Sequence, residues 1–220
     1  MSIQDNWYSD SYKKCYYSGK LGLVWTIVHK AMERKYNKRI DLFRIIEVGS
    51  GQGQHFKFVN HSFSHYLLTD IRPHLFPKFS DSRIETKFAD ASNLDFILDG
   101  SYDRLIATCL LAHLDKPQEA LLEWKRVVRK GGALTIYVPP EPGFLVRCIR
   151  KFFIWPKAKK LGLKNPELVA YLEHRNHYPM MRSLIKDTFQ YDEVSKFRFP
   201  IKFLPWNLSV FDIYHIKKIN

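Results

Sequence analysis

The sequence predicts an α/β fold in which a doubly wound, mostly parallel sheet carries helices on both faces. Short apolar runs that end in a polar residue recur along the chain, as is typical of buried parallel strands. An amphipathic helical segment lies between the last two of these runs, and a strand–helix–strand succession implies right-handed crossovers. Because such sheets bind ligands at the carboxyl ends of their strands, we expect functional residues there.

An amphipathic helix is predicted over residues 19–36. Leu21, Trp25, Val28 and Met32 recur at helical spacing, and a polar Asn-Lys-Arg break follows. The next four apolar runs are predicted as buried strands: Phe43–Val48, Tyr66–Asp70, Ile84–Ala89 and Tyr102–Cys109. The first strand leads into a glycine-rich turn, after which another helix is expected.

A further amphipathic helix is predicted over residues 116–130. Its apolar face consists of Ala120, Leu121, Trp124, Val127 and Val128. Gly131 and Gly132 are expected to end this helix before a fifth strand, Ala133–Val138.

The pattern loosens over residues 139–179, which we interpret as a helical, basic insertion that forms a lid or a substrate-binding segment. A helix over Met180–Phe189 and strands over Val194–Phe199 and Val210–Ile216 are expected to close the chain. We therefore expect a single domain over residues 1–220, divided into a helical cap (1–40), a ligand-binding core (41–138), the insertion (139–179) and a closing segment (180–220).

Composition and charge exclude several classes of protein. The 220 residues are 45% apolar, which is enough for one sizeable core and rules out a disordered tail. The net charge is +13, and residues 141–220 hold 15 basic against 7 acidic residues, which favours a polyanionic partner or an anionic membrane surface. Three cysteines without paired spacing favour a reducing, cytoplasmic setting. Neither a membrane span nor a signal peptide is expected.

The glycine-rich turn after the first strand is the most informative segment. Gly49, Gly51 and Gly53 stand at alternate positions, which permits a tight turn and lets a ligand lie against bare backbone. The spacing differs by one residue from the G-x-G-x-x-G that binds a pyrophosphate. Since the carboxylate of Glu47 could accept a cationic amine, the turn predicts a zwitterionic nucleoside ligand without phosphates.

Two further strand ends carry carboxylates. Asp70 ends the second strand, 17 residues after Gly53, where a doubly wound fold places a carboxylate that accepts both ribose hydroxyls. Asp90, followed by Ala91, ends the third strand, where it would meet an adenine edge. Each feature alone could be a turn or a helix cap, but together and in this order they favour a nucleoside site.

Taken in order, EVGSGQG, TD, FADAS and the segment YDRLIATCLLAHLDKPQEALLEWKRVVRKGGALTIYVP resemble the class I S-adenosylmethionine-dependent methyltransferases of the type 11-like group, over about residues 40–140. The resemblance implies a Rossmann-like sheet of seven strands with an antiparallel C-terminal strand, and S-adenosyl-L-methionine as the cofactor. It also implies the cofactor-binding residues: Glu47, Gly49, Ser50, Gly51 and Gly53 for the methionine part, Asp70 with Ile71 for the ribose, Asp90 and Ala91 for the adenine, and the backbone near Thr108 and Cys109 beside the sulfonium.

Methyl transfer requires alignment of the acceptor and, for a hydroxyl, a base that removes its proton. His113, after the fourth strand, is the leading candidate for this base. Glu141 and the pair His174 and His177 are alternatives, and the two histidines are expected to share one face of a helix. Cys109 is interpreted as buried packing, and no metal site is expected.

The acceptor is predicted to be a small molecule or a glycan. No Asn/Asp-Pro-Pro-aromatic run follows the fourth strand, which disfavours methylation of a nucleic-acid amino group. The flanking segments VHKAMERKY and FPIKFLPWNLSVFDIYHIKK are similar to methyltransferases of bacterial surface-polysaccharide assembly. That similarity implies O-methylation of a sugar, on a phosphate-bearing or lipid-linked carrier.

The basic stretch Arg147–Lys164 leaves three uses open. It can form a lid over the substrate pocket with a solvated basic side, lie on the inner face of an anionic membrane, or contact nucleic acid, which is the least favoured of the three. An RNA methyltransferase that uses this insertion and a catalytically silent cofactor-binding interaction protein are therefore the alternative functions.

Overall fold

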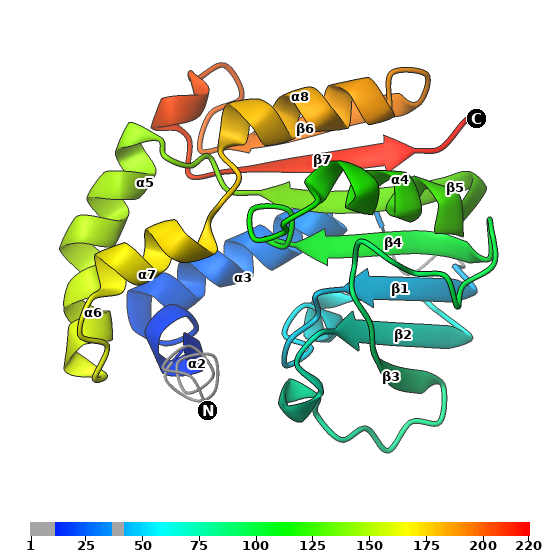
Figure 1. Ribbon diagram of the computed structural model, residues 1–220, viewed down its shortest axis with the longest axis horizontal. Helices are drawn as coiled ribbons and strands as arrows, with labels where there is room; N and C mark the ends of the chain where they lie inside the picture. The colour runs from blue at the N-terminus through cyan, green and yellow to red at the C-terminus, as the bar shows by residue number, and fades with distance from the viewer. Residues whose placement is uncertain (1–11, 37–41) are drawn as a thin grey trace.

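The computed structural model of the chain describes residues 12–36 and 42–220. Across these residues, seven strands form one sheet (Figure 1): β1 Arg44–Val48, β2 His65–Asp70, β3 Ile84–Phe88, β4 Tyr102–Thr108, β5 Val128–Val138, β6 Glu193–Phe199 and β7 Phe211–Lys217. Their order in the sheet is β3-β2-β1-β4-β5-β7-β6. β1 to β5 run parallel, and β7 is antiparallel to both β5 and β6, which confirms the predicted fold class.

Helices cover both faces of the sheet (Figure 1): α3, Gly19–Glu33, lies on one face, and α4, Pro117–Val127, and α8, Tyr178–Thr188, lie on the other. A short helix α2, Tyr12–Tyr16, precedes α3. Val28 and Met32 of α3 pack against apolar side chains of β1 and β4, and the buried ring of Trp124 anchors α4. The spacing of apolar residues thus correctly predicted the buried faces of both helices.

The segment after the glycine-rich turn is not an α-helix, which corrects the sequence-based expectation. Between β1 and β2 the chain forms turns and one short 3-10 helix, η2, Phe56–Phe58. The ring of Phe56 packs edge-on against Tyr66, and that of Phe58 stacks on His29 of α3. Aromatic side chains and α3 therefore cover this part of the sheet in place of a crossover helix.

The glycine pair lies inside β5, whereas the sequence suggested that it separates helix from strand. α4 ends at Val127 and β5 begins at the next residue. A β carbon on Gly132 would lie 2.8 Å from the carbonyl oxygen of Asp103, and the pairing of β4 with β5 shifts register between Tyr102 and Arg104. Glycine is needed here because two backbones approach closely at an irregularity of the ladder.

The insertion lies beyond the carboxyl ends of the parallel strands (Figure 1) and contains α5 Phe144–Ile149, a π-helical turn η4 Arg150–Ile154, α6 Trp155–Lys160 and α7 Pro166–Glu173. The predicted helical, basic character is confirmed, although α8 already begins at Tyr178. Because α7 ends at Glu173, His174 and His177 do not share a helix, contrary to expectation.

In the described part of the chain, Cys15, Cys109 and Cys148 are free thiols. No helix there combines the length and the hydropathy that crossing a membrane requires. The expected N-terminal cap lies partly outside the described residues, which begin at Tyr12 and omit residues 37–41.

Candidate functional site

Two adjoining cavities open at the carboxyl ends of the parallel strands. The first has a volume of about 520 Å³ and is lined by the glycine-rich turn and the ends of β2 and β4. The second, of about 210 Å³, lies between the sheet and helices α5 to α7. Trp25, Cys109, His113 and Glu173 line both cavities, so one wall separates the two spaces.

The glycine-rich turn has the bare backbone that the sequence predicted. Gly49, Gly51 and Gly53 adopt φ angles of 63°, 51° and 63°, in the left-handed region where other residues are strained. A β carbon on Gly49 would lie 2.6 Å from Cδ1 of Leu110. At Gly51 the space is open toward the first cavity, so a ligand can approach the main chain there.

Asp70 is held in place by the backbone of two neighbouring turns. Its Oδ2 accepts the N–H of Gly51 at 2.8 Å and its Oδ1 accepts the N–H of Arg72 at 2.8 Å. A carboxylate has about four acceptor positions, so both oxygens keep a lone pair for a ligand hydroxyl. Asp70 is buried yet lines the first cavity, beside the exposed side chain of Ile71.

The end of β3 forms another part of the same wall. Asp90 is exposed, and its Oδ1 accepts the N–H of Ser92 at 2.8 Å. Ala91 is buried, and its carbonyl accepts the indole N–H of Trp124 at 2.9 Å. Both line the first cavity, as do Thr108 and Cys109. The structure thus brings the three predicted strand ends to one cavity.

Two buried polar side chains at the glycine-rich turn, Glu47 and Ser50, line the first cavity and could bind a charged ligand. Glu47 is buried, accepts the hydroxyl of Tyr66 at 2.7 Å, and has a pKa raised by burial. The hydroxyl Oγ of Ser50 is buried and, among the described residues, has no hydrogen-bond partner. A buried polar atom without a partner costs free energy, and here it lines a cavity that a polar ligand can enter.

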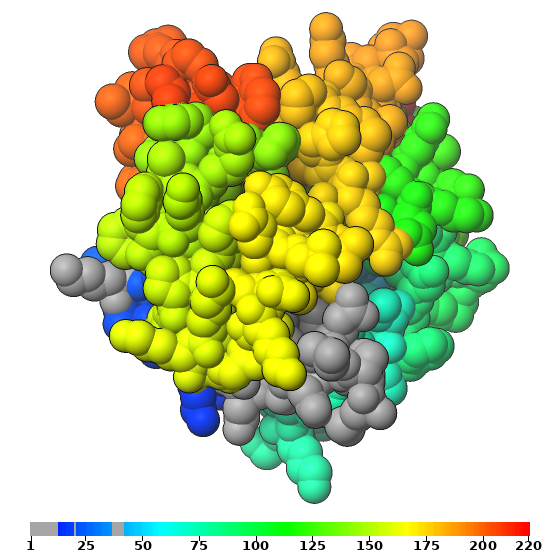
Figure 2. Space-filling view, turned by 60° about the vertical axis from the view of Figure 1, so that its left-hand side comes forward, coloured from blue at the N-terminus to red at the C-terminus, as the bar shows by residue number. Residues whose placement is uncertain are grey.

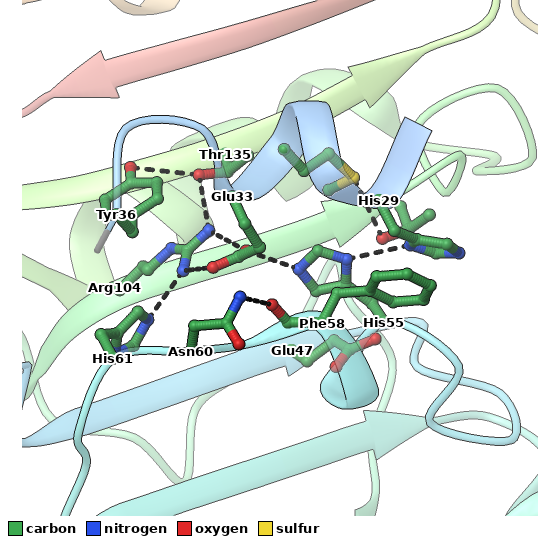
Figure 3. Close-up of polar contacts among 12 residues, drawn as sticks. His29, Glu33, Tyr36, Glu47, His55, Phe58, Asn60, His61, Arg104 and Thr135 are labelled. Carbon is green, nitrogen blue, oxygen red and sulfur yellow. Dashed lines mark hydrogen bonds and ion pairs between the residues drawn. The ribbon is translucent and has the colours of Figure 1, made fainter. Parts of the chain in front are cut away.

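Sequence reasoning missed a buried polar network beside this turn (Figure 3). Arg104 pairs with Glu33, whose Oε1 lies 2.8 Å from Nε2 of His55. The Nδ1 atoms of His55 and His29 lie 3.0 Å apart, and both histidines line the first cavity. Burial, followed by the proximity of His55, lowers the pKa of His29 to about 3. Burial alone would raise the pKa of Glu33, but Arg104 and its hydrogen bonds lower it to about 2.

A signal for this network exists in the sequence. His29 and Glu33 stand four residues apart, so they share a face of α3 with the apolar stripe. Polar residues on the buried side of a helix usually have a partner, and only the fold shows that the partners are Arg104 and His55.

Three of the four predicted catalytic residues meet at the second cavity. The rings of His113 and His174 lie with centroids 4.4 Å apart, and Nδ1 of His113 is 3.7 Å from Oε2 of Glu173. Glu141 forms a buried ion pair with Arg150, and its Oε2 is 3.6 Å from Nδ1 of His174. His177 is exposed and lines neither cavity.

Burial controls the protonation of this cluster. The pKa of Glu141 is raised by burial, which the charge of Arg150 opposes. The pKa of His174 is lowered well below its ordinary value, by burial first and then by the charges of His113 and Arg150. His174 is therefore neutral near pH 7, and its Nδ1 donates to the carbonyl of Ala170 at 2.9 Å.

Cys109 lies between the cavities with a φ of 58°, in the left-handed region. Burial raises the pKa of its thiol, so the neutral form dominates. The side chain is only partly buried against the core and lines both cavities, so the expectation of buried packing holds in part. Its sulfur and the ring nitrogens of His113 and His174 lie within 4.8 Å of one another, a grouping that the sequence did not predict. A side-chain nitrogen of Arg150 lies 3.3 Å from each ring nitrogen of His174, and its charge opposes a cation there.

Comparisons with known proteins identify a methyltransferase domain within the chain. Residues 46–136 match a family model described as a methyltransferase domain. A phosphatidylethanolamine N-methyltransferase from Cereibacter sphaeroides is 31% identical over 100 residues, which are 42% of this chain and 49% of that protein. The match therefore spans about half the length of this curated relative.

Solved structures share the architecture. A chain from the complex of the Haloferax volcanii Trm112 methyltransferase activator with a methyltransferase has a TM-score of 0.67 at 12% identity, over 100% of this chain and 99% of that one. A methyltransferase from Thermotoga maritima has a TM-score of 0.56 at 19% identity, over 88% and 92% of the two chains. The fold is that of class I methyltransferases. The matched methyltransferase domain indicates S-adenosylmethionine as the cofactor.

Proposed function

We propose that the protein is a methyltransferase that binds S-adenosylmethionine in the first cavity and a small acceptor with an apolar part in the second. The observation that carries the proposal is the shared wall of the cavities, where Cys109 and His113 face both spaces. S-adenosylmethionine supplies a methyl group already activated by its sulfonium. The tasks left to the chain are to align the acceptor and to take up its proton.

The residues of the first cavity suit each part of the cofactor. Glu47 would hold the ammonium group, and a polar ligand would satisfy the hydroxyl of Ser50, which has no hydrogen-bond partner among residues 12–36 and 42–220. Asp70 would accept the ribose hydroxyls, and Asp90 with Ala91 would meet the adenine. The backbone at Thr108 and Cys109 would border the methyl group.

His113 is the proposed base for a hydroxyl acceptor. It lies at the boundary of the cavities, and the carboxylate of Glu173, 3.7 Å from its Nδ1, would orient the ring. His174, kept neutral by burial, would accept or position a hydrogen bond beside it. The charge of Glu141 is balanced by the ion pair with Arg150, so we assign Glu141 a positioning role and not that of the base.

The lining of the second cavity supports an amphiphilic acceptor. Its walls are mostly aliphatic and aromatic, and its charged or imidazole groups are His113, Glu141, Arg150, Glu173 and His174. The indole N–H of Trp155 is buried there and, within the described residues, lacks a hydrogen-bond partner. An acceptor oxygen would satisfy this donor, while an apolar chain would fill the remaining walls.

O-methylation of a sugar on a lipid-linked carrier combines these features, and we propose it as the leading reaction. N-methylation of a lipid amine is the second candidate, because the Cereibacter sphaeroides relative is a phosphatidylethanolamine N-methyltransferase by name. The apolar cavity suits the tail of either acceptor and is a poor match for a nucleotide of an RNA chain.

Calorimetric titration with S-adenosylmethionine, its demethylated product and NAD tests the first step. We expect binding of the first two and none of NAD. Transfer of a labelled methyl group to organic-phase extracts, with glycolipids and amino lipids as separate acceptors, tests the second step. Binding without transfer to any acceptor would favour a catalytically silent protein, and tight, salt-sensitive RNA binding with RNA methylation would overturn the acceptor assignment.

A further inference from the structure

Helix α7 is apolar on two opposite sides. Its inner side chains Val169 and Ala170 line the second cavity. Its outer side chains Leu168, Tyr171 and Leu172 are 53%, 49% and 55% exposed, at positions i, i+3 and i+4. A helix that is apolar all round is normally buried all round, so the outer side of α7 has the composition of a contact surface.

The helical run from α5 to α6 repeats this arrangement. Ile149, Ile154 and Ala158 face the second cavity. Phe144, Phe152 and Phe153 point outward and are 56%, 66% and 61% exposed. Figure 2 shows α5, α6 and α7 side by side on one face of the molecule, next to the segment after β6. That segment carries Phe203, which is 88% exposed.

Basic side chains surround these apolar ones. Residues 144–172 contain seven Lys or Arg and one acidic residue, Glu167. Arg150 is buried, and Lys157 donates to the backbone carbonyls of Cys15 in α2 and of Ser18, which precedes α3. Five of the basic residues are exposed: Arg147, Lys151, Lys159, Lys160 and Lys164.

We propose that this surface, the docking face formed by the outer sides of α5 to α7, binds an anionic lipid bilayer, from which the second cavity takes its acceptor. The identity of the acceptor rests on the proposed function. The docking itself rests only on the residues exposed on this surface. Basic residues attract an anionic leaflet, and exposed Phe and Leu side chains insert below its headgroups. The same helices present apolar residues to the bilayer and to the cavity, so a lipid tail would pass between two apolar environments.

A nucleic acid explains less of the surface than a bilayer. Phosphates would pair with the exposed lysines, but Leu168 and Leu172 would remain in water because aliphatic side chains offer no stacking surface for bases. A bilayer accommodates both the charge and the apolar side chains.

Co-sedimentation of the full chain with vesicles tests the docking. We compare vesicles of pure phosphatidylcholine with vesicles that contain phosphatidylglycerol, at low and high salt. The wild type should pellet with the anionic vesicles and less so at high salt. Phe152→Ser with Phe153→Ser, and separately Lys159→Glu with Lys160→Glu, should each lower the partition coefficient by about tenfold or more.

Matched controls lie elsewhere on the surface. Leu122→Ser on α4, where the side chain is 53% exposed, and Lys186→Glu on α8 should leave the partition coefficient unchanged. Leu168→Ser with Leu172→Ser provides a second apolar variant should the phenylalanine pair impair folding. Thermal unfolding and calorimetric affinity for S-adenosylmethionine should match the wild type in every variant, which separates a failure of docking from a failure of the proposed function.

Three results would overturn the docking. The first is equal sedimentation with and without anionic lipid. The second is binding that neither the apolar nor the basic variants reduce. The third is binding to a single-stranded RNA oligonucleotide that the lysine variants abolish and the phenylalanine variants do not, with no vesicle binding, which would assign the face to nucleic acid.

Discussion

Arg104 of β4 donates a hydrogen bond to each carboxylate oxygen of Glu33 in α3, with Nη2 2.6 Å from Oε1 and Nη1 2.9 Å from Oε2. Both side chains are buried, and His55, His61 and Thr135 form further hydrogen bonds with them, whereas Nε of Arg104 has no partner among the described residues. This ion pair joins the N-terminal helix to the central strands, next to the glycine-rich turn. Between β1 and β2, where the chain forms no α-helix, the ion pair therefore stabilises the wall of the first cavity that the glycine-rich turn forms.

Removal of one partner should destabilise the protein strongly. Arg104→Met leaves Glu33 buried without its cation, and we expect a loss of about 3–5 kcal/mol in the free energy of unfolding. The double variant Arg104→Met with Glu33→Met should lose less than the sum of the single variants, because neither charge is then left alone. Urea denaturation measures both. Arg83→Met, at an exposed pair with Asp81, should change little.

Asp70→Asn should weaken binding of S-adenosylmethionine. The amide keeps one acceptor oxygen but loses the charge that would strengthen bonds to ribose hydroxyls, each worth about 1.5–3 kcal/mol. We expect the dissociation constant to rise about tenfold to a hundredfold by calorimetry. Asp95→Asn, at an exposed position outside both cavities, is the control. Unchanged affinity in a folded Asp70→Asn variant would refute the ribose assignment.

His113→Gln should lower turnover while affinity for the cofactor stays near that of the wild type. The side chain borders both cavities, but the proposed role is removal of the acceptor proton, which contributes about 10²–10⁴-fold to a rate. Single-turnover rates with a hydroxyl acceptor measure the effect. His177→Gln should match the wild type, because His177 lines neither cavity. An unaltered rate in His113→Gln excludes it as the base.

Trp155→Phe should raise the KM for the acceptor and leave the cofactor's dissociation constant unchanged. The substitution keeps an aromatic ring in the wall but removes the buried N–H that lacks a partner among the described residues. A neutral hydrogen bond is worth about 0.5–1.5 kcal/mol, which corresponds to a rise of roughly 2- to 12-fold. Trp206→Phe, outside both cavities, is the matched variant. A KM that is the same in both variants would mean that the acceptor does not use this donor.

Stability should fall on mild acidification, and His29 should account for part of the fall. Burial lowers the pKa of His29 to about 3 and that of His215 to about 4, so the folded protein stays unprotonated at both between pH 6 and 5. In the unfolded chain a histidine has a pKa near 6.5 and binds a proton in this pH range. Acidification therefore lowers the free energy of the unfolded state relative to the folded state, and the free energy of unfolding falls. Each histidine adds a slope that approaches about 1.4 kcal/mol per pH unit.

His29→Gln should reduce the slope of unfolding free energy against pH by the contribution of one histidine, about 1.4 kcal/mol per pH unit. Urea denaturation at a series of pH values measures this slope. His74→Gln, at an exposed position, should leave the slope unchanged. A slope that is identical in the wild type and His29→Gln would show that His29 takes up its proton equally in the folded and unfolded states.

Features that depend on a few neighbouring residues could be predicted well. The glycines at 49, 51 and 53 correspond to left-handed backbone, and the carboxylates at Asp70 and Asp90 do lie at one edge of the sheet. The prediction of a helix after Gly53 was wrong. The space that such a helix would occupy is filled by α3 and by the rings of Phe56 and Phe58, and this packing cannot be read from the residues next to Gly53. His174 and His177 were predicted to share one face of a helix, but the end of α7 lies between them and separates the two side chains.

The sequence by itself determined the strands, the glycine-rich turn and the order of the polar residues that line the first cavity, since apolar periodicity and positive φ angles are local requirements. Only the tertiary structure decided which distant side chains meet. His113 reaches Glu173 and His174, and Arg104 reaches Glu33, because elements far apart in the chain pack on one another. The two-sided character of α7 likewise depends on where the fold places it, since a helix's own sequence does not state which of its apolar sides is covered.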